Sequence, residues 1–289
     1  MARLDSIPKM LAPVLLTLSR GNPPVTTDYR AEQTFDNVAL DAANLQSYAD
    51  FCGFDRSRSP IPVSWLYLLA QRAQIALMLG KSFPLAAPGL VHISNSLLLH
   101  SLPDVAKPVA LKTSVAIEGK AAGSLFPQFR VEIIQEGGVC AVCESGYIAK
   151  RGGGEKTPRE QNKTNTDAAP NPLNSALTAG EIVMPSNIGW RYAKVSGDFN
   201  PIHISGVMAK AFGLPGKLAH GWYSVSMMVA ALERVQNQSA RRIDVRFVKP
   251  VLLPTKVALR YAEAESGAMP FWVARPSGEA VHCEGTVEF

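Results

Sequence analysis

Two long apolar segments, one in each half of the chain, dominate the hydrophobic pattern. Residues 64–79 carry apolar side chains around most of a helical circumference, between a potential N-cap, Ser64, and a potential stop, Gly80. Residues 221–235 have the same character. Because a helix that is apolar on nearly all sides is usually buried, the pattern predicts two buried helices.

Each apolar segment is followed by shorter, strand-like runs. In the second half these runs are residues 242–248, 257–262, 271–274 and 280–289. Pro250 and Pro254 bracket the turn between the first two runs, since proline lacks the amide that a central strand needs. Strands grouped after a helix favour an antiparallel sheet. The sequence therefore predicts an α+β fold in which a sheet wraps one buried helix, twice.

A polar segment separates the two halves. Residues 151–175 contain three consecutive glycines and no apolar periodicity, which predicts a flexible linker. We expect an N-terminal unit at residues 1–150 and a C-terminal unit at residues 176–289. Residues 138–146 also align with residues 278–285, which is consistent with an internal repeat.

The composition narrows the class of protein. Of the 289 residues, 47% are hydrophobic and 18% are charged, which allows a large core and argues against global disorder. The apolar runs are shorter than the ~20 residues that cross a bilayer, and the N-terminal segment reads poorly as a signal peptide. We expect a cytoplasmic protein without a membrane span. The four cysteines lack a zinc-binding arrangement, so we expect buried free thiols: Cys52, Cys140, Cys143 and Cys283.

The net charge of +5 raises the question of an anionic partner. Basic residues are scattered and do not alternate with aromatic ones, which disfavours nucleic-acid binding. The densest basic cluster, residues 241–249, includes Arg246 and Lys249. These side chains could meet the phosphates of coenzyme A or an acidic carrier protein. A solvated strand end is an equally good interpretation.

The candidate chemistry is concentrated at residues 196–203, Ser-Gly-Asp-Phe-Asn-Pro-Ile-His, and at a later Ala-His-Gly that ends at Gly221. Asp198 and His203 flank a proline, and in a stiff turn both can reach one water molecule and exchange its protons. The Gly221 amide, at the start of the second buried helix, could stabilise an oxyanion. These groups are suited to the addition of water to an activated acyl chain, or to the removal of water from one.

The surroundings of this motif leave some roles open. Residues 186–196 predict a short helix, residues 198–203 an inter-helix loop, and residues 205–212 a further helix. Asn200 could orient the water or hold the loop. His220 could pack, cap the following helix or contact the substrate. No His, Asp and Glu set at metal-ligand spacing appears, so we expect no metal.

At these residues the chain resembles the MaoC-like dehydratases, the (R)-specific enoyl-CoA hydratases also called hydratase 2. The family motif is an aromatic residue, a spacer, Ser-Gly-Asp-x-Asn-Pro-x-His, and a later His-Gly that opens the central helix. The matching residues are Tyr192, Ser196, Gly197, Asp198, Asn200, Pro201, His203, His220 and Gly221. The resemblance covers about residues 180–289. The first half matches in outline and lacks the motif.

The resemblance implies a double hotdog fold, with two antiparallel sheets each around a long helix. It implies that Asp198 and His203 form the catalytic pair, that Asn200 supports them and that the Gly221 amide forms the oxyanion hole. We further expect substrate contacts from a set that comprises His220, Arg246 and Lys249.

The implied reaction is reversible hydration of trans-2-enoyl thioesters to (R)-3-hydroxyacyl thioesters, on coenzyme A or acyl carrier protein, without a cofactor. The first half would be a degenerate repeat that accommodates the acyl chain, leaving one active site per chain. A homodimer is compatible with this arrangement.

Two other functions remain open. A hotdog thioesterase would need a carboxylate on the central helix, where Glu233 lies near the far end. A non-catalytic subunit that binds acyl chains would have no need of both Asp198 and His203.

Overall fold

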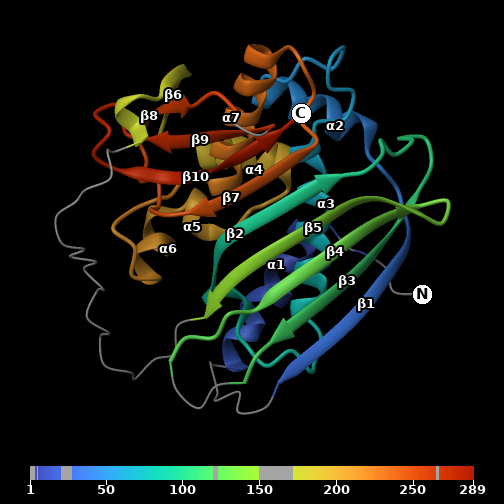
Figure 1. Ribbon diagram of the computed structural model, residues 1–289. Helices are drawn as coiled ribbons and strands as arrows, with labels where there is room; N and C mark the ends of the chain where they lie inside the picture. Colours follow the sequence, from blue (N-terminus) through green and yellow to red (C-terminus); the bar gives the residue numbers. More distant parts are fainter. Residues whose placement is uncertain (1–3, 5, 21–27, 120–122, 150–171, 265–266) are drawn as a thin grey trace.

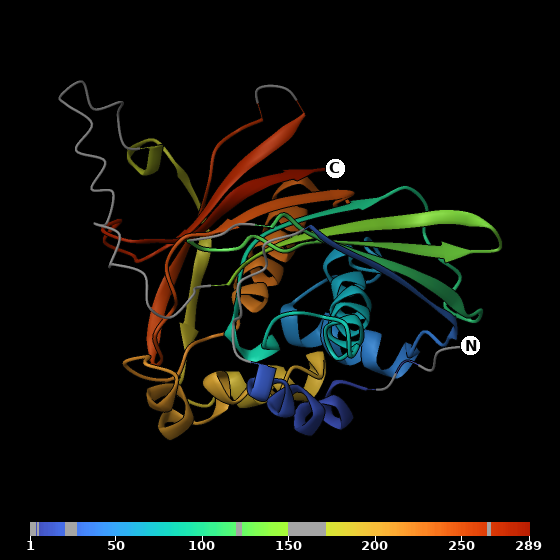
Figure 2. The same ribbon diagram turned by 90° about the horizontal axis from the view of Figure 1, so that it is seen from below.

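Ten antiparallel strands form one continuous sheet, and the helices lie on one side of it (Figures 1 and 2). The computed structural model describes residues 4, 6–20, 28–119, 123–149, 172–264 and 267–289. The strands are β1 (Tyr29–Val38), β2 (Leu90–Leu99), β3 (Val109–Ile117), β4 (Gln128–Gln135), β5 (Gly138–Ala149), β6 (Leu177–Met184), β7 (Arg242–Phe247), β8 (Thr255–Tyr261), β9 (Ala268–Ala274) and β10 (Val281–Glu288). The α-helices are α1 (Ile7–Leu16), α2 (Ala42–Cys52), α3 (Val63–Met78), α4 (Ile188–Ser196), α5 (Pro201–Ile204), α6 (Gly206–Ala211) and α7 (Gly221–Gln236).

The sheet repeats one topology. Its order is β1-β3-β4-β5-β2-β7-β10-β9-β8-β6, so the five strands on each side of the centre follow the same connectivity in mirror order. β5 contains the first of the two segments that align in sequence, and β10 contains most of the second; these strands occupy equivalent places beside β2 and β7. In each half the long helix comes between the first and second strand: α3 lies between β1 and β2, and α7 between β6 and β7. The topology is therefore an internal repeat.

The sheet differs from the sequence prediction in one respect. The sequence predicts two sheets, whereas β2 pairs with β7 along a register that runs from Ser94↔Arg246 to Leu98↔Arg242. An edge strand exposes unpaired amides and carbonyls. The β2–β7 pairing satisfies those of both strands and merges the two sets of strands into one sheet. The predicted α+β class with antiparallel strands is confirmed.

The two long helices are buried under the sheet, as their apolar circumferences predict. α3 and α7 each have 16 residues, of which twelve and eleven are buried. A hydrogen bond joins the two helices, because Trp222 Nε1 of α7 donates to the Ser64 carbonyl of α3 at 2.9 Å. α2 also contacts α7, where Tyr48 OH lies 2.6 Å from Ser226 Oγ. α3 begins after Pro62, so that Ser64 lies inside the helix rather than at its cap.

Three further expectations concern the whole chain. The predicted linker at residues 151–175 lies mostly outside the described residues, which resume at residue 172. In the described part of the chain, no helix is long and apolar enough to cross a membrane. All four cysteines are free and buried, as predicted.

Candidate functional site

The turn after α4 holds Asp198 in a fixed place. α4 ends at Gly197, which has a φ of 77° and therefore adopts a left-handed conformation that glycine favours. The amide of Asp198 then donates to Ser196 Oγ at 3.1 Å. The amide of Asn200 donates to Asp198 Oδ1, also at 3.1 Å. Local bonds on both sides thus orient the carboxylate.

His203 lies on a short helix, where the sequence predicts a loop. Pro201 occupies the first turn of α5, where its missing amide costs no hydrogen bond. Asn200 is the N-cap, and its Oδ1 accepts from the Ile202 amide at 3.3 Å. These two residues supply the start signal for a helical turn. The turn places His203 Nδ1 at 2.9 Å from the Leu218 carbonyl oxygen.

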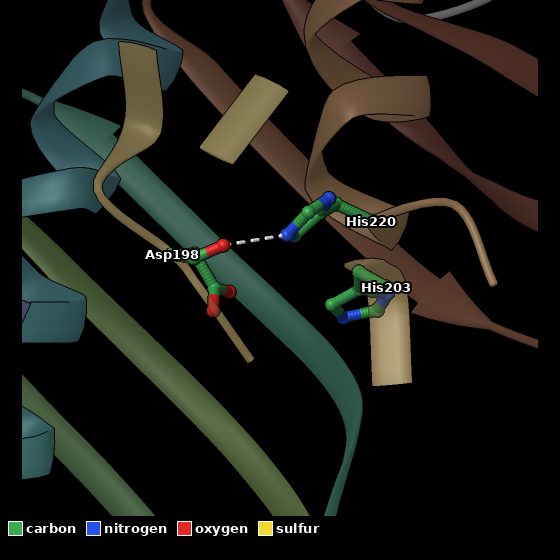
Figure 3. Close-up of side chains that lie close together, drawn as sticks. All are labelled: Asp198, His203 and His220. Carbon is green, nitrogen blue, oxygen red and sulfur yellow. Dashed lines mark hydrogen bonds between the residues drawn. The ribbon is translucent and has the colours of Figure 1, made fainter. Parts of the chain in front are cut away.

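His220, the residue before α7, completes the cluster shown in Figure 3. Its Nε2 lies 2.9 Å from the Asp198 carbonyl oxygen, and because a carbonyl only accepts, Nε2 carries the proton. The rings of His203 and His220 lie 3.8 Å apart between centroids. Nδ1 of His220 is buried without a partner among the described residues. Asp198 and His203 remain partly accessible, whereas His220 is 3% exposed.

Burial and charge set the protonation states of the three side chains. Burial opposes ionisation of Asp198, but the electrostatic interaction with His220 and His203 as they gain protons in acid, together with the hydrogen bond from Gln71, outweighs it and lowers the pKa of the carboxyl. Burial lowers the pKa of His203, against the opposing pull of Asp198. Burial also lowers the pKa of His220. At neutral pH the site therefore holds an ionised carboxylate and two neutral imidazoles.

Nε2 of His203 is the ring nitrogen of this cluster with a lone pair available for proton transfer. Because Nδ1 donates its proton to the Leu218 carbonyl, Nε2 of the neutral ring is left as an acceptor. A neutral imidazole nitrogen and a carboxylate side by side can hold a water molecule or a hydroxyl and move one of its protons.

Gly221 opens α7 directly beside this pair. Its amide is among the first of the helix, which have no intrahelical acceptor. A Cβ at this position would lie 2.8 Å from the Phe247 ring, so only glycine fits against that side chain. An amide without an acceptor at a helix N-terminus is a suitable donor for an oxyanion.

Two residues that the sequence does not single out also shape the site. Gly189 of α4 lies against α5 so closely that a Cβ would be 2.0 Å from the His203 carbonyl oxygen. Gln71 of α3 donates from Nε2 to Asp198 Oδ2 at 2.8 Å. A lone glycine within a helical pattern is a weak signal for such close packing. Nothing in the sequence marks Gln71.

The two basic residues of the sequence prediction lie away from this cluster. Ile243, Val245 and Phe247 of β7 face the core, so the alternating residues, among them Arg246, face the opposite side of the sheet. There Arg246 pairs with Glu284 beside a shallow hollow of about 500 Å³. Lys249 is exposed just beyond β7.

Asp198, His203 and His220 are also residue types that bind metal ions, so their geometry can be compared with that of a metal site. One ligand atom from each of Asp198, His203 and His220 lies within 4.8 Å of the others. This spread is wider than the roughly 3.4 Å between the ligands of a tetrahedral zinc ion. Proton transfer is the better fit for these three side chains.

Comparisons with known proteins agree with the motif. Residues 161–269 match the family model described as MaoC like domain. The 3-hydroxyacyl-thioester dehydratase X of Mycobacterium tuberculosis is 29% identical over 266 residues, which cover 88% of this chain and 89% of that protein.

Solved structures extend the likeness to the fold. A crystal structure of HtdX from Mycobacterium tuberculosis has a TM-score of 0.70 at 24% identity, over 89% of this chain and 99% of that one. A MaoC-like dehydratase from Phytophthora capsici has a TM-score of 0.60 at 17% identity, over 91% of this chain and 95% of that one. At these identities the likeness concerns the fold, which is the hotdog fold that the motif implied.

Proposed function

Because this chain carries a MaoC-like domain, we propose that it is a hydro-lyase that interconverts 3-hydroxyacyl thioesters and 2-enoyl thioesters with water. Its likeness over most of its length to a 3-hydroxyacyl-thioester dehydratase supports this reaction class. The single observation that carries the proposal is the convergence of an ionised Asp198 and a neutral His203 beside the first amide of α7.

The proposed roles follow from the proton positions. In dehydration a base removes the proton on C2, and the hydroxyl on C3 leaves as water. His203 is the base, because its Nε2 lone pair is free. The imidazolium then returns the same proton to the departing hydroxyl, so the enzyme has no net gain or loss of protons. Asp198 stays ionised, stabilises the imidazolium and accepts a hydrogen bond from the hydroxyl.

The thioester carbonyl needs its own partner. Negative charge builds on its oxygen once the C2 proton has left. The amide of Gly221 is the proposed donor, and the dipole of the 16-residue helix α7 adds to its effect. Gly221 has no side chain of its own to obstruct this amide, and a Cβ there would meet the Phe247 ring at 2.8 Å.

The remaining details of the reaction are part of the same proposal. The resemblance to (R)-specific hydratases supports the (R) configuration of the hydroxyacyl product. We propose that the first half accommodates the acyl chain and that each chain has one active site, since the motif occurs once. Lys249, exposed two residues beyond Phe247, is the proposed contact for a phosphate of coenzyme A or of a carrier-protein arm.

Thioester hydrolysis is the less favoured alternative. Its carboxylate would have to be Glu233, which is 1% exposed and accepts from the Ala240 amide at 3.0 Å. At 1.5 Å per residue, Glu233 lies about 20 Å along α7 from His220. A carboxyl group so placed is a structural residue of the helix end.

Hydration of crotonyl-CoA by the purified protein tests the proposal. We expect loss of the absorbance of the conjugated enoyl thioester without release of free thiol, and a 3-hydroxybutyryl product of (R) configuration. Asp198→Asn and His203→Ala each lower kcat by on the order of 10²–10⁴. The control is His100→Gln, an exposed histidine in the other half. Thiol release would indicate a thioesterase, and full activity of both variants would refute the assigned roles.

A further inference from the structure

A glutamine from the first half of the chain reaches the carboxylate of the site in the second half. Gln71 on α3 donates from Nε2 to Asp198 Oδ2 at 2.8 Å, across 127 positions of sequence. Because an ionised carboxylate only accepts hydrogen bonds, the side-chain amide must present its nitrogen to Asp198. We propose that Gln71 is a positioning residue for the reaction, which fixes Asp198 for its work with His203; this inference rests on the proposed function.

The carboxylate is held at both oxygens. Oδ1 accepts from the Asn200 amide, which belongs to the same turn as Asp198, and Oδ2 accepts from Gln71. Each carboxylate oxygen has two lone-pair sites, so each keeps one for the substrate hydroxyl or the water. The turn alone fixes one oxygen. Gln71 supplies the second contact, which removes rotation of the carboxylate about its Cβ–Cγ bond.

A buried hydrogen-bond network fixes the rotation of α3 and hence the direction of Gln71. One turn further along the helix, Gln74 donates to Ser145 Oγ of β5 at 2.8 Å. Tyr147 OH of the same strand donates to Gln74 Oε1 at 2.9 Å. Asn95 of β2 also donates to Ser145 Oγ, at 2.7 Å. Gln74 is completely buried, so these bonds are strong constraints on the face that α3 presents.

The charge of Asp198 affects the pKa of titratable groups on several surrounding elements. His203 and His220 face it from α5 and from the start of α7. Burial is the main cause of the raised pKa of Tyr67 on α3, Tyr147 on β5 and Tyr192 on α4, and the charge of Asp198 adds to each shift. The same charge opposes the lowering by burial of the pKa of His92 on β2. Among these neighbours, Gln71 is an uncharged donor that contacts the carboxylate directly, and its hydrogen bond favours the ionised form of Asp198.

This role has a consequence that a purely structural contact lacks. Removing a donor from an ionised carboxylate makes that carboxylate more basic, and the Asp198–His203 pair then takes up a proton at a higher pH. Since the pair works with Asp198 ionised and His203 neutral, the acid limb of the pH profile of kcat/KM moves to higher pH. Loss of folding stability alone would leave the position of that limb unchanged.

The experiment compares Gln71→Leu and Gln71→Glu with the wild-type enzyme in crotonyl-CoA hydration. We expect Gln71→Leu to lower kcat/KM on the order of tenfold, the loss of one hydrogen bond to a charged group, and to shift the acid limb upward. Gln71→Glu keeps the number of heavy atoms and so the packing. It sets a second carboxylate against Asp198, and the upward shift should be larger.

Two further variants distinguish a failure of the proposed role of Gln71 from a failure of the proposed function. Gln46→Leu is the matched control, because Gln46 is a helix glutamine, on α2, whose side chain hydrogen-bonds Asp50 and Arg56 at an exposed site. It should leave the profile unchanged. Unaltered acid limbs in both Gln71 variants, with Asp198→Asn inactive, would overturn the role of Gln71 and keep the proposed function. Full activity of Asp198→Asn would instead overturn the proposed function.

Discussion

Gly189 offers the sharpest test of the site geometry, because it packs against the main chain of His203, the proposed base. A Cβ at this position would lie 2.0 Å from the His203 carbonyl oxygen and 2.9 Å from its carbonyl carbon. Real Cβ contacts are essentially never closer than 3.0 Å, so Gly189→Ala forces α4 and α5 apart by about 1 Å. No flexible side chain can yield instead, since both atoms belong to the main chain.

The separation changes the Asp198–His203 distance whichever helix moves. Asp198 follows α4, and His203 lies on α5. A misplacement of about 1 Å in a catalytic site costs on the order of 10²-fold in rate, or about 2.7 kcal/mol. We therefore expect Gly189→Ala to lower kcat for crotonyl-CoA hydration about 100-fold, with a smaller change in KM, because the proposed acyl-chain site lies in the first half of the chain.

Gly216→Ala is the matched control. Gly216 lies in the loop before α7, has an ordinary φ, and a Cβ there would meet no atom within 4 Å. Circular dichroism and thermal denaturation of both variants separate a displaced site from an unfolded chain. If Gly189→Ala remains folded and turns over substrate as fast as Gly216→Ala, the packing of α4 on α5 does not set the position of His203, and the reasoning fails.

Three other expectations concern the buried titratable groups. Burial raises the pKa of Glu233 to about 7, so the stability that this residue contributes is present below pH 4.5 and is lost as the pH rises towards 7. Glu233→Gln should therefore raise the free energy of unfolding at pH 8 by up to about 2–3 kcal/mol, measured as a higher Tm, and have little effect at pH 4.5. Burial lowers the pKa of His92 to about 4 and also lowers the pKa of His220. The free energy of unfolding should therefore fall as the pH drops below 6.5, by up to about 1.4 kcal/mol per pH unit for each histidine. Denaturant titrations at pH 7 and pH 5 measure this loss, and equal stabilities would contradict it. Burial raises the thiol pKa of Cys52, Cys143 and Cys283, so a thiol reagent at pH 8 should modify them only after denaturant is added, and rapid labelling of the native protein would show that they are accessible.

The sequence was sufficient for the parts of the site that depend on local chain geometry. Asp198, Asn200 and His203 fall within one turn, and the chemistry of capping residues and proline brings them together whatever surrounds them. The two buried helices were equally predictable, because their apolar circumference is a property of consecutive residues.

The remaining contacts depend on packing between distant segments. Gln71 and Asp198 lie 127 positions apart, and their meeting requires the docking of α3 against the turn that follows α4, which no local pattern encodes. The single sheet has the same origin. β2 and β7 each look like a strand with partners in its own half, and their mutual pairing follows from the assembly of the two halves.

The pairing of β2 with β7 also determines how the protein behaves on dilution. Gln71 and Asp198 are delivered by two repeats of one covalent chain, held together by a shared sheet and by a hydrogen bond between α3 and α7. A site assembled from two separate copies would fall apart below its dissociation constant, whereas tethering keeps the effective concentration of the two parts high. Turnover per chain should accordingly stay constant down to nanomolar enzyme, with or without a second copy of the molecule.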